Sequence, residues 1–134
     1  MIVITILLYL WQLPQLLVAL CMYPFLGKKR IVGRDRFGRV CYEAKRMVGG
    51  ISLGPISYVS PWSREETIAH ELRGHTRDSL YLGPLYLLVI GLPSIIWAMT
   101  YNREKHCYYD FYTERRANRF AGLEVKNCRL EFKK

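Results

Sequence analysis

A chain of 134 residues suits one small domain, and 51% of its residues are hydrophobic while 23% are charged. The formal net charge of +9 indicates an anionic partner, and the absence of any charged side chain in residues 1–26 favours a membrane with anionic headgroups. No paired CxxC fingers and no aromatic platform motifs occur, so we expect no nucleic-acid partner. The four cysteines show no metal-ligand spacing and are interpreted as reduced thiols.

Residues 1–26 predict an N-terminal transmembrane helix that anchors the rest of the chain, residues 27–134. The segment is longer than the roughly 20 apolar residues that cross a bilayer, although Gln12, Pro14 and Gln15 interrupt it. Lysines and arginines follow from Lys28 onward, and the positive-inside tendency therefore predicts a membrane protein with its site on the cytoplasmic face. The alternative is a helix buried in the core.

The next part of the chain predicts a small antiparallel β-sheet. Residues 31–44 alternate apolar and charged side chains around a glycine-containing turn, which is typical of a β-hairpin. Residues 49–60 indicate one further strand, with Gly54 and Pro55 as a bulge or kink. The edge of such a sheet either pairs with an extended peptide or is purely structural.

Helical signals dominate the second half, which makes the predicted fold class α+β. Ser63 and Glu66 form a capping-box pattern, which predicts a helix from near Arg64 through Glu71. Residues 81–101 are uncharged but broken by glycine and proline. Because basic residues lie on both sides, we expect a re-entrant or interfacial helix pair, with a second transmembrane helix as the alternative.

The C-terminal segment predicts a helix followed by a tail. "YYDFYTERRANRFAG" has helical character and ends at Gly122, a suitable glycine for a helix C-terminus. The basic residues from 126 to 134 are expected to form a surface tail.

The stretch "HELRGH" suggests a metal site, although its spacing differs from the H-E-x-x-H of zinc peptidases. Residues four apart on a helix differ by about 40° in direction, whereas residues five apart, such as His70 and His75, differ by about 140°. A π-bulge absorbs one extra residue, and Gly74 eases an irregular backbone there. The spacing therefore predicts a bulge between Glu71 and His75. A catalytic zinc needs a third protein ligand, for which Glu114 is the candidate.

The sequence resembles two groups of zinc peptidases, and both resemblances support a metal site. "HELRGH" and Glu114-Arg115-Arg116-Ala117 resemble the H-E-x-x-G-H and E-x-R-A-E motifs of the dipeptidyl peptidase III family. Over more of the chain, through Ser52-Leu53-Gly54, 82–97 and 111–118, the sequence resembles a group of small, uncharacterised bacterial membrane-associated, gluzincin-like zinc metallopeptidases.

The resemblance implies a zincin-like domain in residues 27–134 that binds Zn²⁺ through His70, His75 and Glu114. Glu71 would be the general base for the zinc-bound water, and Asn118 would hydrogen-bond a ligand histidine. Possible oxyanion donors lie close to the third ligand: His106, Tyr108, Tyr109 and Tyr112. The alternative for these four is a packed aromatic rim.

The predicted function is therefore that of a membrane-anchored zinc metallopeptidase that hydrolyses a peptide or protein substrate. The alternative is a non-catalytic membrane protein, an interaction or assembly factor with a structural or degenerate metal site.

Overall fold

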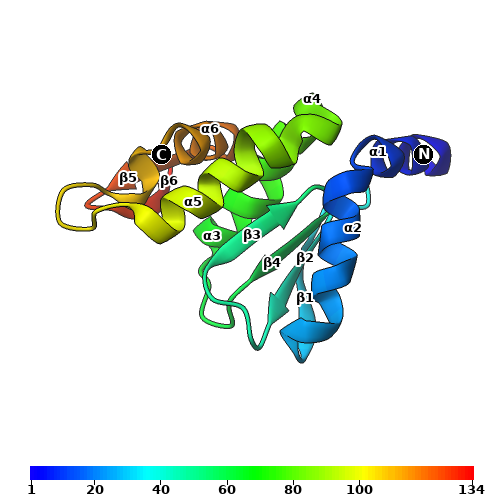
Figure 1. The fold of residues 1–134 in the computed structure, drawn as a ribbon, viewed down its shortest axis with the longest axis horizontal. Helices are drawn as coiled ribbons and strands as arrows, with labels where there is room; N and C mark the ends of the chain where they lie inside the picture. The colour runs from blue at the N-terminus through cyan, green and yellow to red at the C-terminus, as the bar shows by residue number, and fades with distance from the viewer.

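A four-stranded sheet with helices packed around it, and a separate two-stranded hairpin, form an α+β fold (Figure 1). The computed structural model describes residues 1–134. The larger sheet consists of β1 (Lys29–Arg34), β2 (Val40–Ala44), β3 (Gly50–Leu53) and β4 (Ile56–Val59). Its strand order is β1-β2-β4-β3, so β3 lies at an edge. The predicted α+β class is confirmed.

The larger sheet is mixed, so the predicted antiparallel sheet is wrong in one pairing. β1 and β2 form the expected hairpin, but β2 and β4 are parallel. Residues 49–60 form two strands rather than one, because Gly54 and Pro55 make a hairpin turn and Gly54 adopts φ +72°. The following strand contains the completely buried Tyr58 and Val59, and their burial explains why β4 takes the central place beside β2.

The N-terminal segment forms two helices, so the single anchor helix predicted for residues 1–26 is wrong. α1 (Ile2–Trp11) ends at Gln12, and α2 (Leu13–Met22) continues into a 3-10 turn at Tyr23–Leu26, at 85° to α1. No helix alone has the length and apolarity needed to cross a membrane, whereas this bent pair meets both criteria when its halves are counted together.

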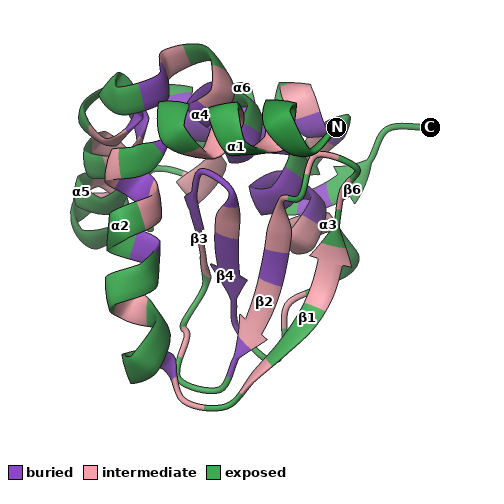
Figure 2. Cartoon of the chain, turned by 90° about the vertical axis from the view of Figure 1, so that its right-hand side faces the viewer, coloured by how far each residue is buried: buried purple, intermediate pink, exposed green.

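α2 packs against the larger sheet and does not stand apart from residues 27–134 (Figures 1 and 2). Ala19 is fully buried, and its carbonyl accepts a hydrogen bond from the Tyr58 hydroxyl at 2.7 Å. Leu26, Leu53 and Ala44 complete this core cluster. The same helix therefore contributes both to the core and to an outer apolar surface.

The break between α1 and α2 is held by a buried polar network. The Ser79 hydroxyl donates to Gln12 Oε1 at 2.6 Å and accepts from Gln15 Nε2 at 2.8 Å. Gln15 Nε2 also donates to the carbonyl of Gly83 at 3.0 Å. The two glutamines that interrupt the apolar segment are 1% and 0% exposed, so they attach the N-terminal helices to the central helix.

We expect Ser79→Ala to lower the free energy of unfolding by about 2 kcal/mol, because it leaves the buried Gln12 Oε1 without a donor and removes one of the two acceptors of Gln15 Nε2. Urea denaturation measures the change. Thr100→Ala, which removes an exposed hydroxyl, should change stability by less than about 0.5 kcal/mol. Equal effects of the two variants would show that the network contributes little.

The central helix is continuous from residue 65 to 82 and contains a π-helical stretch. It comprises α3 (Glu65–Ala69), the π-helical segment His70–His75 and α4 (Thr76–Leu82). The irregularity expected from the extra residue is thereby confirmed. Gly74 is used differently from the prediction: its backbone is not in the left-handed region, and its missing side chain lets the Ala117 backbone approach.

The predicted capping box at the start of this helix does not form. Arg64 is the N-cap residue, and no side chain caps the helix. The Ser63 hydroxyl instead pairs with that of Ser60 at 2.8 Å, and Glu66 accepts from Arg64 at 2.8 Å. These local partners compete with the capping bonds.

Residues 81–101 do not form one straight helix. A 3-10 turn at Gly83–Leu85 separates α4 from an apolar helix that spans Leu87–Thr100, where a π-helical turn (Leu87–Gly91) leads into α5 (Leu92–Thr100). Gly83 has φ +50°, and Trp11 occupies the space that a side chain would need. The chain breaks at Gly83, but the two half-helices expected from Gly91 and Pro93 are not formed, because one helix runs through both residues.

The C-terminal helix matches its prediction, whereas the tail does not. α6 (Tyr112–Ala121) ends at Gly122, which is left-handed with φ 71° and ψ 33°. The tail expected from residue 126 onward belongs to a hairpin of β5 (Leu123–Lys126) and β6 (Arg129–Phe132). Leu123 and Leu130 are buried with Ala121, and this small cluster explains why the basic segment folds back.

Candidate metal centre

Three electron-pair donors from two helices converge at the π-helical segment. His70 Nε2 lies 3.2 Å from His75 Nε2 and 2.9 Å from Glu114 Oε2, and His75 Nε2 lies 3.4 Å from the same oxygen. Ligand atoms of a tetrahedral zinc, at bond lengths near 2.0–2.1 Å, are about 3.3 Å apart. The observed triangle therefore has the size that a tetrahedral metal ion requires.

The π-helical turn is what brings the two histidines together. On a regular helix two side chains five residues apart would point about 140° apart. Here the ring centroids of His70 and His75 are 4.8 Å apart. α6 supplies Glu114. This helix can approach closely because residue 74 is glycine: a side chain there would meet the carbonyl oxygen of Ala117 at 2.5 Å.

An ion pair fixes α6 to the central helix beside this site. Arg116 donates to one oxygen of the fully buried Asp78 through Nε at 3.0 Å and through Nη2 at 2.8 Å. Burial raises the pKa of the Asp78 carboxyl, and Arg116 opposes this change. The pair therefore sets the position of α6 and hence of the Glu114 carboxylate.

Asn118 determines which nitrogen of His70 faces the centre. Asn118 Oδ1 is an acceptor and lies 2.6 Å from His70 Nδ1, so Nδ1 carries the proton and donates it. With the proton on Nδ1, the Nε2 atom can present a lone pair toward Glu114 Oε2. Two acceptors at 2.9 Å require a proton or a cation between them, which is the arrangement of a metal site.

The charges within the site also suit a cation. Burial opposes ionisation of Glu114, but the close contacts of its carboxylate with the His70 and His75 imidazoles outweigh it and hold the pKa of this carboxyl well below its usual range. Burial lowers the pKa of His75, yet its hydrogen bond to Glu114 prevails and raises that pKa to about 9. Without a metal the proton on His75 balances Glu114, and a bound cation would replace it.

Glu71 is the second carboxylate of the site. It is 5% exposed, and together with His70 and His75 it offers ligand atoms within 4.8 Å of one another, a buried group that could hold a metal ion. Its Oε2 has no hydrogen-bond partner, and burial raises its pKa while His75 and His70 lower it. A free carboxylate oxygen of raised basicity is what a general base needs.

Gly50 provides the space for Glu71, a role that the sequence pattern did not reveal. A side chain at Gly50 would meet Glu71 Oε1 at 2.6 Å. The edge strand β3 therefore lies directly against this carboxylate. The only sequence signal is the paired glycine at the start of the strand, which is equally typical of a turn.

Two of the four candidate oxyanion donors lie at the site, and the other two do not. Tyr109 packs against His70 with ring centroids 5.9 Å apart, and Tyr108 lines the same cavity as Glu71 and Glu114. Tyr112 instead donates to the carbonyl of Val89 at 2.6 Å, and the exposed His106 packs on Trp97. The structure does not bring the latter two to the site, because Tyr112 bonds to the π-helical turn before α5 and His106 packs on Trp97 of α5.

Both tyrosines at the site are neutral donors at physiological pH. Burial, reinforced by Glu114 and Glu71, raises the pKa of Tyr109 to about 12 and also raises that of Tyr108. Trp97 Nε1 donates to the carbonyl of Tyr108 at 2.7 Å and so positions this segment beside the site.

With Zn²⁺ as the probe ion, we expect Asn118→Ala to weaken metal binding at this group by about 10- to 100-fold, because His70 loses the bond that fixes its tautomer and ring orientation. Competition titration with a zinc-sensitive chelating dye measures this affinity. Asn102→Ala, which changes an exposed asparagine, is the matched control. An unchanged affinity in Asn118→Ala would exclude the proposed role of Asn118.

Comparison with known proteins gives no further guidance: no protein-family model, no curated protein and no solved structure matches this sequence. The chemistry of the site must therefore be argued from its own residues.

Proposed function

We propose that this chain is a membrane-associated, zinc-dependent metallopeptidase. The observation that carries the proposal is the convergence of His70 Nε2, His75 Nε2 and Glu114 Oε2 beside the unpartnered carboxylate oxygen of Glu71. Two imidazoles and one carboxylate are the ligand set of many catalytic zinc sites, which keep a fourth position open.

Different residues of the chain would bind the metal, transfer the proton and stabilise the oxyanion during hydrolysis. Zinc, when bound, supplies Lewis acidity and activates water for attack at neutral pH. His70, His75 and Glu114 would hold the ion, and Glu71 would accept the proton of the attacking water and pass it to the leaving amine. Tyr108 and Tyr109 are neutral O–H donors at the same cavity, suited to the developing oxyanion.

An extended peptide is the substrate that suits the position of the edge strand. β3 pairs with a strand, β4, on one side only; its Ser52 carbonyl accepts from the Tyr86 hydroxyl at 2.9 Å, and its Gly50 lies against Glu71. A free strand edge binds a further strand through main-chain hydrogen bonds. A peptide added there would have its backbone next to the general base.

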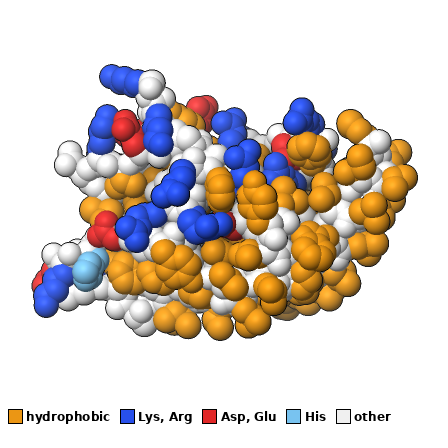
Figure 3. Space-filling view, turned by 90° about the horizontal axis from the view of Figure 1, so that it is seen from above, with side chains coloured by type: hydrophobic (Ala, Val, Ile, Leu, Met, Phe, Trp, Pro, Cys, Tyr) orange, Lys and Arg blue, Asp and Glu red, His pale blue; other side chains and the backbone are white.

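The membrane association is proposed from the distribution of side chains on the surface. In Figure 3, hydrophobic side chains gather along the lower and right-hand parts of the view, whereas most lysines and arginines lie in its upper left and centre. Large exposed apolar residues lie along the N-terminal helices and the helix Leu87–Thr100, among them Ile2, Leu7, Leu17, Leu88, Ile96 and Met99. Patches of this kind mark contact surfaces, and basic residues beside them favour anionic lipid. Reporter fusions after Arg34 and Lys134 should both report the cytoplasm.

The test of the proposed activity uses the full-length chain in detergent, loaded with zinc. It should cleave an unfolded protein substrate into fragments that mass spectrometry identifies. A chelator should stop cleavage, and added zinc should restore it. The His75→Ala variant, purified identically, controls for contaminating proteases. A zinc-loaded wild-type protein that produces no fragments would contradict the peptidase proposal.

A non-catalytic metal site is the second candidate, favoured by the closeness of Glu71. Its carboxylate lies within ligand distance of the two histidines and is nearly fully buried. If Glu71 were a fourth ligand, the site would be closed, as structural zinc sites are. The protein would then be an interaction or assembly factor in the membrane.

A further inference from the structure

Two cavities of different character meet at the metal centre. One has a volume of about 610 Å³ and the other of about 500 Å³. Gly50, Glu71, Ala98 and Tyr108 line both of them. The volumes lie within the range of ordinary ligand-binding pockets, so a substrate passing Glu71 would occupy both.

The larger cavity is apolar apart from the site itself. It lies between α2, β3 and α5, and 13 of its 20 lining residues are hydrophobic. Its only ionisable carboxylates and imidazole belong to Glu71, Glu114 and His75. Outside these residues of the metal centre no charged side chain lines the cavity, so it suits large apolar side chains.

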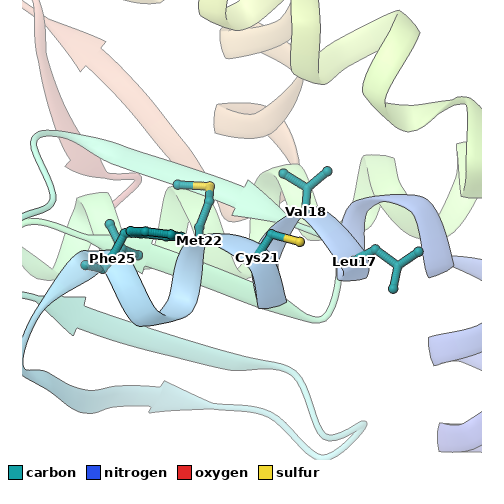
Figure 4. Close-up of a pocket in the computed structure, with 6 residues that line it drawn as sticks. Leu17, Val18, Cys21, Met22 and Phe25 are labelled. Atoms are coloured by element: carbon teal, nitrogen blue, oxygen red, sulfur yellow. The ribbon is translucent and has the colours of Figure 1, made fainter.

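The apolar surface continues along α2 beyond the cavity. Val18 and Met22 line the larger cavity and also a neighbouring hollow of about 400 Å³, whose other lining residues are Leu17, Cys21, Phe25 and Leu26 (Figure 4). All six residues of this hollow are hydrophobic. An apolar segment leaving the cavity therefore meets further apolar surface rather than charge.

The smaller cavity has the opposite character. Arg103, which has no carboxylate partner, and Arg64, whose Nη2 already donates to Glu66 at 2.8 Å, line it together with Trp62, Ser60, Ser63 and Thr67. Glu71 is its only carboxylate, and this residue belongs to the catalytic site. The wall therefore suits polar or acidic side chains, which guanidinium groups bind through charge-assisted hydrogen bonds.

The edge strand fixes the order in which a peptide would meet the two cavities. Val48 and Gly49 line the smaller cavity, Gly50 lines both, and Ile51–Leu53 line the larger one. Antiparallel pairing is two- to three-fold more common than parallel pairing overall. An antiparallel peptide would lay its N-terminal part along Leu53 and its C-terminal part along Val48.

We propose that the preferred substrate is a peptide with consecutive large apolar residues before the scissile bond and acidic residues after it, as at the junction between a hydrophobic segment and its polar flank. This inference rests on the proposed peptidase activity. The apolar half would fill the cavity between α2 and α5, and the acidic half would face Arg64 and Arg103.

The test compares four internally quenched decapeptides with the zinc-loaded, full-length protein in detergent micelles. One has an apolar half followed by an acidic half, one has the reverse order, one is polar throughout and one is apolar throughout. The first should be cleaved at least about tenfold faster, by kcat/KM, than each of the others.

Matched variants test each cavity separately. Ile95→Asp places a charge in the apolar cavity and should lower kcat/KM for the apolar–acidic peptide by about tenfold or more. Thr100→Asp, at an exposed position on the same helix but outside the cavity, should leave it unchanged. Arg103→Glu should slow cleavage of that peptide, whereas Lys105→Glu, also exposed but outside the cavity, should not.

The outcomes separate this inference from the proposed function. Cleavage of the polar or reversed peptide as fast as the apolar–acidic one would overturn the substrate preference while leaving the peptidase intact. Equal effects of Ile95→Asp and Thr100→Asp would overturn the role of the cavity. A zinc-loaded protein that cleaves none of the four peptides or the unfolded protein would instead contradict the peptidase activity itself.

Discussion

Glu71→Gln is expected to lower peptide hydrolysis by about 10²- to 10⁴-fold while leaving the zinc content unchanged. Glutamine has nearly the same shape as glutamate but cannot accept the proton of the attacking water. The ligand atoms of His70, His75 and Glu114 do not depend on Glu71 for their positions. Kinetic measurement of peptide cleavage and elemental analysis of the same preparation provide the two readouts.

Glu65→Gln is the matched control, because Glu65 lies on the same helix and is exposed. It should alter neither activity nor zinc content. Loss of zinc from Glu71→Gln would identify Glu71 as a fourth ligand and favour the closed, non-catalytic site. Full activity in Glu71→Gln would contradict the general-base mechanism directly.

Gly74→Ala should lower the free energy of unfolding by about 3 kcal/mol, because one added methyl group overpacks the contact between two helices. The new carbon would lie 2.5 Å from the carbonyl oxygen of Ala117, and the backbone of α6 would have to move. Since α6 carries Glu114, zinc affinity should fall with stability. Denaturation of the zinc-loaded protein and zinc titration measure the two effects.

Gly91→Ala provides the comparison, since it adds the same methyl group to another helical glycine. Its nearest neighbour would be Leu87 Cδ2 at 3.4 Å, the end of a flexible side chain. Its stability should change by less than about 0.5 kcal/mol. If Gly74→Ala were equally mild, the close approach of α6 to the π-helical segment would not be needed to form the site.

The sequence predicted the geometry of the site best where the signal was local. One extra residue between His70 and His75 can be accommodated only by an irregular turn if the side chains are to converge, and the structure has a π-helical segment there. Gly122 likewise ended its helix as expected, because few residues other than glycine adopt a left-handed conformation easily.

Features that depend on distant partners were not predictable in the same way. Gln12 and Gln15 resemble minor interruptions of an apolar helix until Ser79, more than 60 residues away, becomes their partner. The parallel pairing of β2 with β4 depends on how the β3–β4 hairpin packs beside β2, and the alternation of apolar and polar side chains does not predict that arrangement. Composition could not separate Tyr108 from Tyr112. Only their packing against the helix Leu87–Thr100 places Tyr108 at the site and ties the Tyr112 hydroxyl to Val89, away from it.

Zinc content per chain, measured by elemental analysis in the wild type, His75→Ala and Glu114→Ala, tests the existence of the metal centre most directly. The account predicts one zinc per wild-type chain and close to none in either variant, because each variant removes a ligand atom from the triangle around the site. The same low, sub-stoichiometric zinc content in all three proteins would contradict it.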